Sequence, residues 1–553
     1  MDYRFLIVLA LAVMILTIPV SRKINRRSMR RRLIAQWGKV PGGIEQDSLD
    51  DIKNYWIARK EAEEIKNFVD DTTWEDLDMD KVYQSFRRTG SIVGDELLYA
   101  TLRDTGMSDD AIKRRVERVD FFMSDEQARL CAQMALRRIN KARFHNASAY
   151  LYNAQLRLPK YWLLYFAQVI LFFMAFIVGF FHTPFFFVAA KLFVLNMVVY
   201  YVTMRRIQPE MCALRHIASV VNCAKEITRM QCAPLNPEIE HIKERLRAIT
   251  PVRLWFSMFE LESAGAMDIF TEYIKLLFML DLISFCAIVR GISRWGLAVR
   301  AIYEGIGALD VDVALASVRM SANDLCRAQF HDAMHVNATA MTHPLIKEAV
   351  PNDVTWNQNM LVTGSNASGK STFIKAIAVN AILAQTVGFC YAQSFQMSRA
   401  RVMSSMAIRD SIVRGESYFI AEIRSLKRLL DGVNSGERVL CFVDEILRGT
   451  NTIERIAASC CVLRAMTAPT ARCVAATHDI ELTQMLDDAY GDWHFSESVT
   501  DAGISFDYCL RDGPATGRNA IALLKQMGYG EEIVNGALDA VQAFECNRKW
   551  ETS

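Results

Sequence analysis

The stretch GSNASGKST, which begins at Gly364, combines glycines, a lysine and two hydroxyl residues at a spacing that suits the binding of phosphate groups. It fits the pattern G-x-x-x-x-G-K-[ST]. In this pattern the glycines let backbone N–H groups turn toward phosphates, the lysine reaches the β- and γ-phosphate oxygens, and the hydroxyl ligates Mg²⁺. We therefore predict that Gly364, Gly369, Lys370 and Thr372 contact a nucleotide and that Ser371 is a magnesium ligand.

Two further groups of polar residues end short apolar runs. ERVLCFVDEILRGTN carries Asp444 and Glu445 at the end of its apolar part, and ARCVAATHDIELT carries His478 in the same position. A carboxylate there can hold magnesium through water, the adjacent glutamate can orient or deprotonate an attacking water, and a polar residue at the next strand end can sense the γ-phosphate. We predict Asp444 as a metal ligand, and Glu445, His478 and Lys370 as the catalytic residues.

The segments on either side of the glycine-rich stretch favour a phosphate loop over a chance turn. NMLVTG before it is a short apolar run of the kind that forms a buried strand, and STFIKAIAVNAILAQ after it has helical spacing. A strand followed by a helix would bring the phosphates to a helix N-terminus, where backbone N–H groups are free to bind anions.

Composition limits the class of protein. A chain of 553 residues should form several domains, and its hydrophobic content of 52% is concentrated in a few blocks. The 13 cysteines show no paired spacing, which indicates reduced thiols in a cytosolic body and neither a disulfide framework nor a metal site. A net charge of +2 gives no global argument for nucleic-acid binding.

Three apolar blocks have lengths close to those that cross a bilayer: residues 5–20, 161–181 and 185–204. The first is followed, not preceded, by a run of basic residues, so an uncleaved anchor is favoured over a signal peptide. The other two are separated by three residues and predict a hairpin. A fourth block, residues 274–289, contains Lys275 and Asp281, and we predict that it is a buried core helix.

The basic residues beside these blocks predict the topology. Arg157 and Lys160 precede the hairpin, and Arg205 and Arg206 follow it. The positive-inside rule then puts the N-terminus and the hairpin tip outside and the rest of the chain in the cytoplasm. The predicted location is the cell membrane, with several spans, lipid contacts and a cytoplasmic C-terminal region.

A basic stripe precedes the hairpin. Residues 127–160 contain seven Lys or Arg and no Asp or Glu. Such a stripe could face DNA, or it could flank the membrane and contact lipid; its position beside a span favours lipid. Residues 205–340 have helical spacing interrupted by prolines.

The order of motifs in residues 341–540 resembles that of the MutS mismatch-repair ATPase family. The matching stretches are HPLI, PND, TGSNASGKST, AQTVGF, GESYFIAE, DEILRGTNT, ATHDIELT and LRDGPATGRNAIALLKQMG. GALDVDVALASVRMSAN, just upstream, resembles the helix by which the family's lever enters its ATPase domain. No L-S-G-G-Q signature of a transporter ATPase is present, and 73 residues between Lys370 and Asp444 leave no room for a long coiled-coil insertion.

The resemblance implies an α/β phosphate-loop ATPase domain of the MutS type, joined to an all-α lever region, that binds ATP and Mg²⁺ as a homodimer. Asn366 would lie near the phosphates, and Ser417 would match the signature serine that reaches the nucleotide of the opposite subunit. Residues 448–452 would lie at the dimer seam. Ala349 stands where the family has an aromatic residue that stacks on adenine, and Tyr508 is positioned to substitute for it.

The resemblance does not extend to the family's DNA-reading parts. No N-terminal domain with a Phe-x-Glu wedge is visible, and FSE at residues 495–497 is interpreted as a chance match inside the ATPase region. Two functions stay open: an ATPase switch acting on or near DNA, with an unknown protein partner, and an ATP-driven membrane machine whose lever moves the hairpin without DNA. The predicted domains are an anchor (1–20), a basic helical region (21–160), the membrane hairpin (161–204), a helical lever (205–340) and the ATPase domain (341–553).

Overall fold

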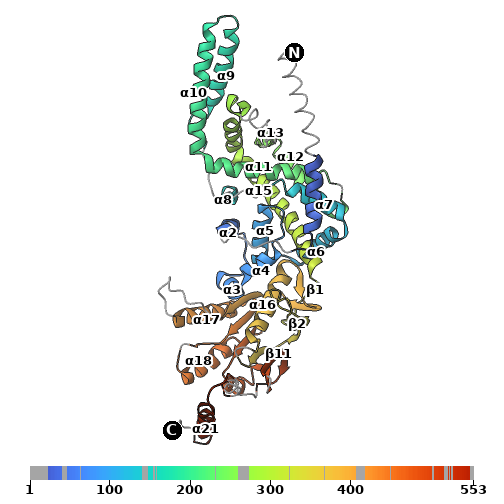
Figure 1. Cartoon of the computed structure of the whole chain (residues 1–553), viewed down its shortest axis with the longest axis vertical. Helices are drawn as coiled ribbons and strands as arrows, with labels where there is room; N and C mark the ends of the chain where they lie inside the picture. The colour runs from blue at the N-terminus through green and yellow to red at the C-terminus, as the bar shows by residue number, and fades with distance from the viewer. Residues whose placement is uncertain are drawn as a thin grey trace. The chain divides into compact units, whose positions relative to one another are not determined.

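The chain folds into two units, a helical unit and a sheet unit (Figure 1). The helical unit comprises residues 1–66, 83–102 and 113–323, and the sheet unit comprises residues 67–82, 103–112 and 324–553. The predicted domain division stays a prediction. The computed structural model describes residues 23–39, 47–62, 64–139, 147–152, 156, 158–230, 232–259, 273–322, 324–365, 368–406, 418–448, 450–500, 503–515, 521, 524 and 527–547.

The helical unit is organised around α15 (Leu280–Ser321), which bends by 99° between Ile292 and Arg294 and packs against α11, α12 and α13. Its inner face is lined by buried aliphatic and aromatic residues such as Ile302, Tyr303 and Ile306. The other helices of this unit are α2 (Asp47–Glu61), α4 (Met79–Phe86), α5 (Ile92–Arg103), α6 (Asp109–Ser124), α7 (Glu126–Leu136), α8 (Ala147–Tyr152), α11 (Gln208–Ile227), η1 (Ala233–Leu235), α12 (Asn236–Ala248) and α13 (Thr250–Met258); the first residues of α4 and α6 and the last of α5 belong to the sheet unit.

Two helices of this unit, α9 (Trp162–Gly179) and α10 (Pro184–Arg206), form the hairpin expected from the sequence. Both are long and apolar enough to cross a membrane, with mean hydropathies of 2.2 and 2.0, and they are the two straight helices in the described part of the chain that pass this test. They pack on each other through a cluster centred on Phe172, Ala175 and Ala189. Their outward leucine, isoleucine and phenylalanine side chains are exposed. The third predicted span, residues 5–20, lies outside the described residues.

The core helix predicted over residues 274–289 is interrupted. Residues 273–277 are helical, Met279 has a left-handed φ of 48°, and α15 begins at Leu280. Its two charged residues are themselves buried: Lys275 and Asp281 are 3% and 1% exposed. Asp281 accepts hydrogen bonds from the Tyr200 hydroxyl at 3.1 Å and from Arg215 at 2.9 Å.

The basic stripe predicted before the hairpin is divided among different contacts. Arg129 is buried, and its guanidinium lies 4.0 Å from the ring centre of Trp37. Arg138 forms an ion pair with Glu226 of α11. Residues 140–146 lie outside the described part of the chain. The structure therefore shows the contacts of individual basic residues and does not describe a continuous stripe.

The sheet unit contains two sheets with helix α16 (Lys370–Thr386) packed against both. One sheet has the order β3-β2-β6-β1-β5. The other has the order β11-β10-β4-β9-β8-β7, in which all neighbours are parallel except β10 and β11. The strands are β1 (Leu325–His331), β2 (Val336–Met341), β3 (Asn352–Trp356), β4 (Asn359–Thr363), β5 (Phe389–Tyr391), β6 (Ser394–Ser398), β7 (Arg401–Ser405), β8 (Val439–Asp444), β9 (Ala471–Thr477), β10 (Tyr490–Thr500) and β11 (Gly503–Asp512).

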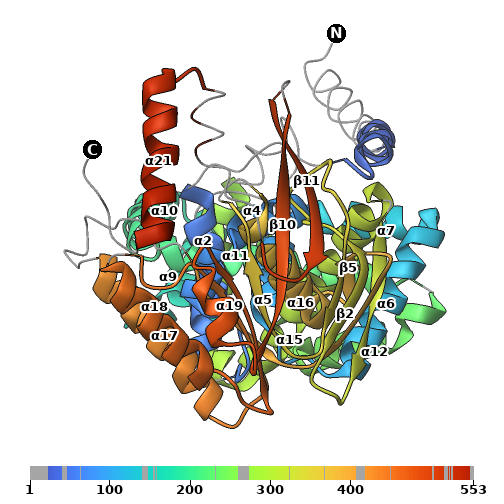
Figure 2. The same cartoon turned by 90° about the horizontal axis from the view of Figure 1, so that it is seen from below.

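Further helices cover the second sheet. A cluster of buried apolar residues joins β8 and β9 to α17 (Tyr418–Asn434), α18 (Thr452–Ala465) and α19 (Glu481–Met485). Figure 2 shows these three helices on one side of β10 and β11, with β2 and β5 on the other. Helix α21 (Glu531–Asn547) ends the described chain. Because β4 and β8 are buried along their whole length, and β9 at every residue except the half-buried Arg472, their largely apolar sequences are those of central parallel strands.

An early segment of the chain, residues 67–82, belongs to the sheet unit. Its helix α3 (Asp71–Asp76) packs on β7: Asp76 accepts hydrogen bonds from the Ser404 hydroxyl at 2.7 Å and from the Met406 N–H at 3.0 Å. Asp70 pairs with Arg428 of α17, and Asp78 pairs with Lys375 of α16 at 2.8 Å. The segment thus ties together the helices that follow the phosphate loop and the predicted signature serine.

Candidate functional site

The loop between β4 and α16 has the backbone conformation that its glycines allow. Gly364 and Gly369 have φ values of 139° and 103°, which side-chain-bearing residues rarely adopt. A Cβ on Gly364 would lie 2.8 Å from the carbonyl oxygen of Phe495. Gly369 precedes the first residue of α16, so the exposed N–H groups of that helix face the end of the loop. Asn366 lies outside the described residues.

Lys370 reaches back across this loop. Its amino group donates to the carbonyl oxygens of Gly364 and Ser365 at 2.7 and 2.6 Å. The same nitrogen lies 3.4 Å from Nε2 of His478. Burial lowers the pKa of Lys370 to about 8, although the nearby Glu445 and Asp444 act in the opposite direction. The lysine is therefore a buried cation whose present acceptors are neutral carbonyls.

Asp444, the last residue of β8, has a buried carboxylate oxygen without a hydrogen-bond donor among the described residues. The side chain is buried, and its Oδ1 has no hydrogen-bond partner among the described residues. Leaving such an oxygen unsatisfied is costly. Ser371 and Thr372 lie in the first turn of α16, half-buried and exposed respectively. One carboxylate and one hydroxyl, completed by phosphates and water, is a donor set that suits Mg²⁺.

Glu445 sits in a constrained position directly after Asp444. Its φ is 51°, in the left-handed region that is unusual for a residue with a side chain, and its N–H donates to the carbonyl of Ala476 at 3.0 Å. One carboxylate oxygen lies 2.9 Å from His478 Nε2, and the other pairs with Arg448. Burial raises the pKa of Glu445, but the hydrogen bond from His478 and the charge of Arg448 outweigh it and leave the pKa below its usual value.

His478 follows β9 and connects the two groups above. Its ring nitrogen approaches both Lys370 and Glu445, and the side chain is 35% exposed. The backbone after it is fixed by Asp479, whose N–H donates to the Thr477 hydroxyl at 2.9 Å and whose carboxylate accepts two hydrogen bonds from Arg455, at 3.0 and 2.6 Å. The predicted catalytic residues Lys370, Glu445 and His478 are thus brought into direct contact.

Comparisons with known proteins identify relatives of the region that contains these residues. The family model MutS domain V matches residues 360–545. The protein named DNA mismatch repair protein MutS 2 from Halobacterium salinarum is 30% identical over 260 residues, covering 44% of this chain and 29% of that protein. DNA mismatch repair proteins MutS from Aquifex pyrophilus and Thermus aquaticus are 29% and 28% identical, covering 43% and 46% of this chain and 29% and 32% of those proteins. Residues 360–545 of this chain therefore form a region of the MutS domain V type.

The similarity to MutS is partial. The chain matches less than a third of the length of these relatives. The MutS domain V match begins in β4 and ends in α21, so it includes the phosphate loop, Asp444, Glu445 and His478. The hairpin α9–α10 lies outside it.

Tyr508, the predicted base-contacting residue, lies beside the phosphate loop of the MutS domain. A Cβ on Gly369 would be 3.1 Å from the tyrosine ring, and the side chain is 44% exposed. Tyr508 has a left-handed φ of 54°. Its carbonyl accepts a hydrogen bond from the side chain of Asn352 at 2.9 Å, and Asn352 in turn accepts one from the Leu510 N–H at 2.7 Å. Asn352, the Asn of the PND stretch, therefore holds the backbone on both sides of Tyr508.

Sequence reasoning missed a residue of the loop's surroundings. Glu497 of β10 accepts a hydrogen bond from the Ser365 hydroxyl, and Phe495 packs edge-on against Phe373 at 5.5 Å. The FSE stretch, interpreted as a chance match, therefore packs against the phosphate loop in this MutS domain. The three residues FSE do not by themselves predict this contact. It follows from their position on β10, the strand that pairs with β4.

Only some of the residues predicted to form the dimer contact lie in the described part of the chain. Ser417 and Gly449 lie outside it. Helix α17 is described from Tyr418 onward. Asn451 caps α18 by accepting a hydrogen bond from the Ile453 N–H at 3.0 Å. The role of these residues in a MutS-type dimer stays a prediction.

Proposed function

We propose that this chain is a membrane-anchored ATPase that binds ATP with Mg²⁺ at the end of β4 and hydrolyses it as a dimer. One observation carries the proposal. Thr363 of β4 pairs with Thr477 of β9, and Asp444 of β8 pairs with Ala476 of β9. The phosphate loop, His478 and Glu445 therefore leave three neighbouring parallel strands at one edge, where α/β sheets bind their ligands.

The lysine and the metal ligands have separate tasks in this proposal. The amino group of Lys370 exchanges the carbonyls of Gly364 and Ser365 for phosphate oxygens, which are stronger acceptors because they are charged. Ser371 and Asp444 hold Mg²⁺, which when bound neutralises charge on the phosphates. The buried, unsatisfied Oδ1 of Asp444 supports this assignment.

Glu445 acts as the base that takes a proton from the attacking water. Its lowered pKa keeps it ionised near neutral pH, but both of its oxygens are engaged, by His478 and by Arg448. One oxygen must be released before it can accept the proton. Arg448 belongs to the segment 448–452 predicted at the dimer seam, so we propose that docking of the second subunit withdraws Arg448 and frees the base.

The second subunit also supplies a contact to the nucleotide. Ser417 precedes α17, whose N-terminal N–H groups suit the negative charge of a γ-phosphate. In the proposed dimer this serine reaches the ATP bound by the opposite copy, with Tyr508 beside the base and Asn366 beside the phosphates. ATP then links the two subunits.

DNA is the proposed partner of this ATPase, because the relatives described above are named as DNA mismatch repair proteins. The hairpin places the proposed protein in the cell membrane, in contact with lipid and with the ATPase region in the cytoplasm. The second candidate, a membrane machine without DNA, is favoured by Asp281. This residue near the start of α15 binds both Tyr200 of α10 and Arg215 of α11, so α15 and the hairpin are joined at one buried group.

ATP turnover by Glu445→Gln tests the proposal. We expect this variant to bind ATP and Mg²⁺ but to hydrolyse ATP at least about 10²-fold more slowly, the loss typical of a missing general base. The matched control is Glu454→Gln on the exposed face of α18, which should retain normal turnover. Normal hydrolysis by Glu445→Gln would contradict the assignment of the base.

Binding of the detergent-solubilised dimer to DNA separates the two candidates. Phosphate contacts make affinity fall steeply as salt increases. Affinity for homoduplex, mismatched or branched DNA that decreases in this way supports the first candidate. Absent or salt-insensitive binding with every nucleotide state supports the membrane machine.

A further inference from the structure

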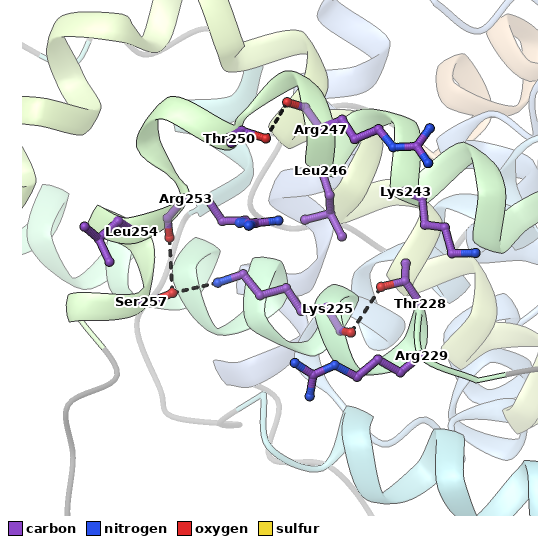
Figure 3. A pocket seen from close by; sticks show the side chains of 10 residues that line it. All are labelled: Lys225, Thr228, Arg229, Lys243, Leu246, Arg247, Thr250, Arg253, Leu254 and Ser257. Atoms are coloured by element: carbon purple, nitrogen blue, oxygen red, sulfur yellow. Dashed lines mark hydrogen bonds between the residues drawn. The ribbon is translucent and has the colours of Figure 1, made fainter.

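A hollow in the helical unit gathers basic side chains from three helices. Helices α11, α12 and α13 surround it, and its volume is about 570 Å³. Figure 3 shows Lys225 and Arg253 extending from opposite helices toward the same space, with Leu246 of α12 beside them. The five basic residues that line it are Lys225, Arg229, Lys243, Arg247 and Arg253.

The charged side chains that line the hollow are all basic. Among the described residues that line it, none is acidic. Lys225 donates at 2.6 Å to two neutral oxygens, those of the Asn222 side chain and the Ser257 hydroxyl. Lys243 and Arg247 share Glu240 at 3.3 and 3.6 Å, but that carboxylate is 59% exposed, and such surface pairs contribute little.

The hollow offers donors to a ligand more than acceptors. The hydroxyls of Thr228, Thr250 and Ser257 donate to backbone carbonyl oxygens three or four residues earlier in the chain. The exposed residues Arg229 and Arg253 therefore supply the N–H donors that a ligand in the hollow can reach. Two guanidinium groups with a lysine between them suit an oxyanion with several acceptors, above all a phosphate, which arginine binds through paired N–H groups.

Apolar residues at the rim indicate the source of that phosphate. Leu254 lines the hollow and is 61% exposed, next to Arg253 and followed by the half-buried Trp255. Basic residues beside an exposed leucine and a partly exposed tryptophan are typical of helices at a membrane surface.

The hollow is also connected to the hairpin. Helix α11 follows α10 after one residue, Ile207. In Figure 1, α13 lies on the same side of α11 as the hairpin does. Arg229 further lines a second hollow together with Lys23, Arg26 and Arg138, and the first two of these follow the predicted N-terminal anchor. Basic groups thus continue toward the segments predicted to enter the membrane.

We propose that the hollow between α11, α12 and α13 binds the phosphate group of an anionic phospholipid. The lipid source rests on the proposed membrane anchoring; the binding of a phosphate does not. The lipid phosphate sits between Arg229 and Arg253, and its glycerol and acyl parts lie along Leu254.

Calorimetric titration of the full-length protein in detergent tests this site. The probes are dihexanoyl phosphatidylglycerol, dihexanoyl phosphatidylcholine and a short DNA duplex, each at physiological salt. The variant Arg229→Gln/Arg253→Gln removes two exposed cations of the hollow, and Lys113→Gln/Arg114→Gln removes two exposed cations from α6 as a charge-matched control. Because the short-chain lipid is presented in solution, the result depends neither on ATP hydrolysis nor on membrane insertion.

We expect phosphatidylglycerol to bind and phosphatidylcholine to bind much more weakly. The hollow variant should lose about a hundredfold in affinity for phosphatidylglycerol, because hydrogen bonding of each arginine to a charged phosphate contributes about a factor of ten. The α6 control should stay close to wild type. Equal losses in both variants, equal binding of the two lipids, or a loss in the hollow variant confined to DNA would overturn the proposal.

Discussion

Asn352 is predicted to act on nucleotide binding through Tyr508. Its amide spans the Tyr508 carbonyl and the Leu510 N–H at 2.9 and 2.7 Å, on either side of a residue held at a φ of 54°. Asn352→Ala removes two hydrogen bonds, each contributing about 1 kcal/mol, from a left-handed conformation that itself costs roughly 1–2 kcal/mol. The backbone is then expected to relax and to move the ring away from Gly369.

The assay is the affinity for a fluorescent ATP analogue. A base stacked on an aromatic ring contributes about 1–3 kcal/mol, so Tyr508→Ala should weaken binding roughly fivefold to a hundredfold or more, and Asn352→Ala should approach that loss. If Asn352 acts through Tyr508, the double variant should be no worse than Tyr508→Ala alone. Additive losses, or unchanged affinity in Asn352→Ala, would refute this reasoning. Asn352→Asp keeps the acceptor for the Leu510 N–H, so its affinity for the analogue should lie between those of wild type and Asn352→Ala.

Three further predictions concern topology, packing and pH. A cysteine introduced at Thr183 should react with an impermeant reagent only from outside the cell; labelling from the cytoplasm would reverse the topology. Arg428→Ala should lower the free energy of unfolding by about 1–3 kcal/mol, because it removes the cation paired with Asp70 and leaves that carboxylate only its hydrogen bonds from Thr73, whereas the exposed neighbour Lys427→Ala should cost under about 0.5 kcal/mol. Burial raises the pKa of Glu96 to about 8, against the effect of the Tyr303 hydroxyl at 2.6 Å, so the folded state favours its protonated form. Its stabilising contribution is therefore present at low pH and lost as pH rises through about 8, and chemical denaturation should show wild type losing stability relative to Glu96→Gln between pH 5 and 8.

Local patterns in the sequence predicted the parts of the site that are built from strand ends. The apolar runs before Gly364, Asp444 and His478 are buried parallel strands, and their common edge follows from the parallel pairing. The hairpin was also predictable, because two long apolar runs separated by three residues have few alternatives.

Contacts between distant segments were not predictable from these patterns. Asp70 and Arg428 are 358 positions apart, and Asn352 and Tyr508 are 156 apart, so no local periodicity relates them. The break before α15 depends on Met279 in a left-handed conformation, which a methionine does not signal. Glu497 was overlooked because only the pairing of β10 with β4 brings it to the loop.

Recovery of ATP hydrolysis in a mixed dimer is the most direct test of a site shared by two copies of this chain. Lys370→Ala and Ser417→Arg subunits, each nearly inactive alone, are combined, and heterodimer formation is verified. If the serine acts on the opposite subunit's nucleotide, one site carries both changes and the other carries neither, so hydrolysis should return to a fraction of the wild-type rate. If verified heterodimers are no more active than either parent, the shared site is contradicted.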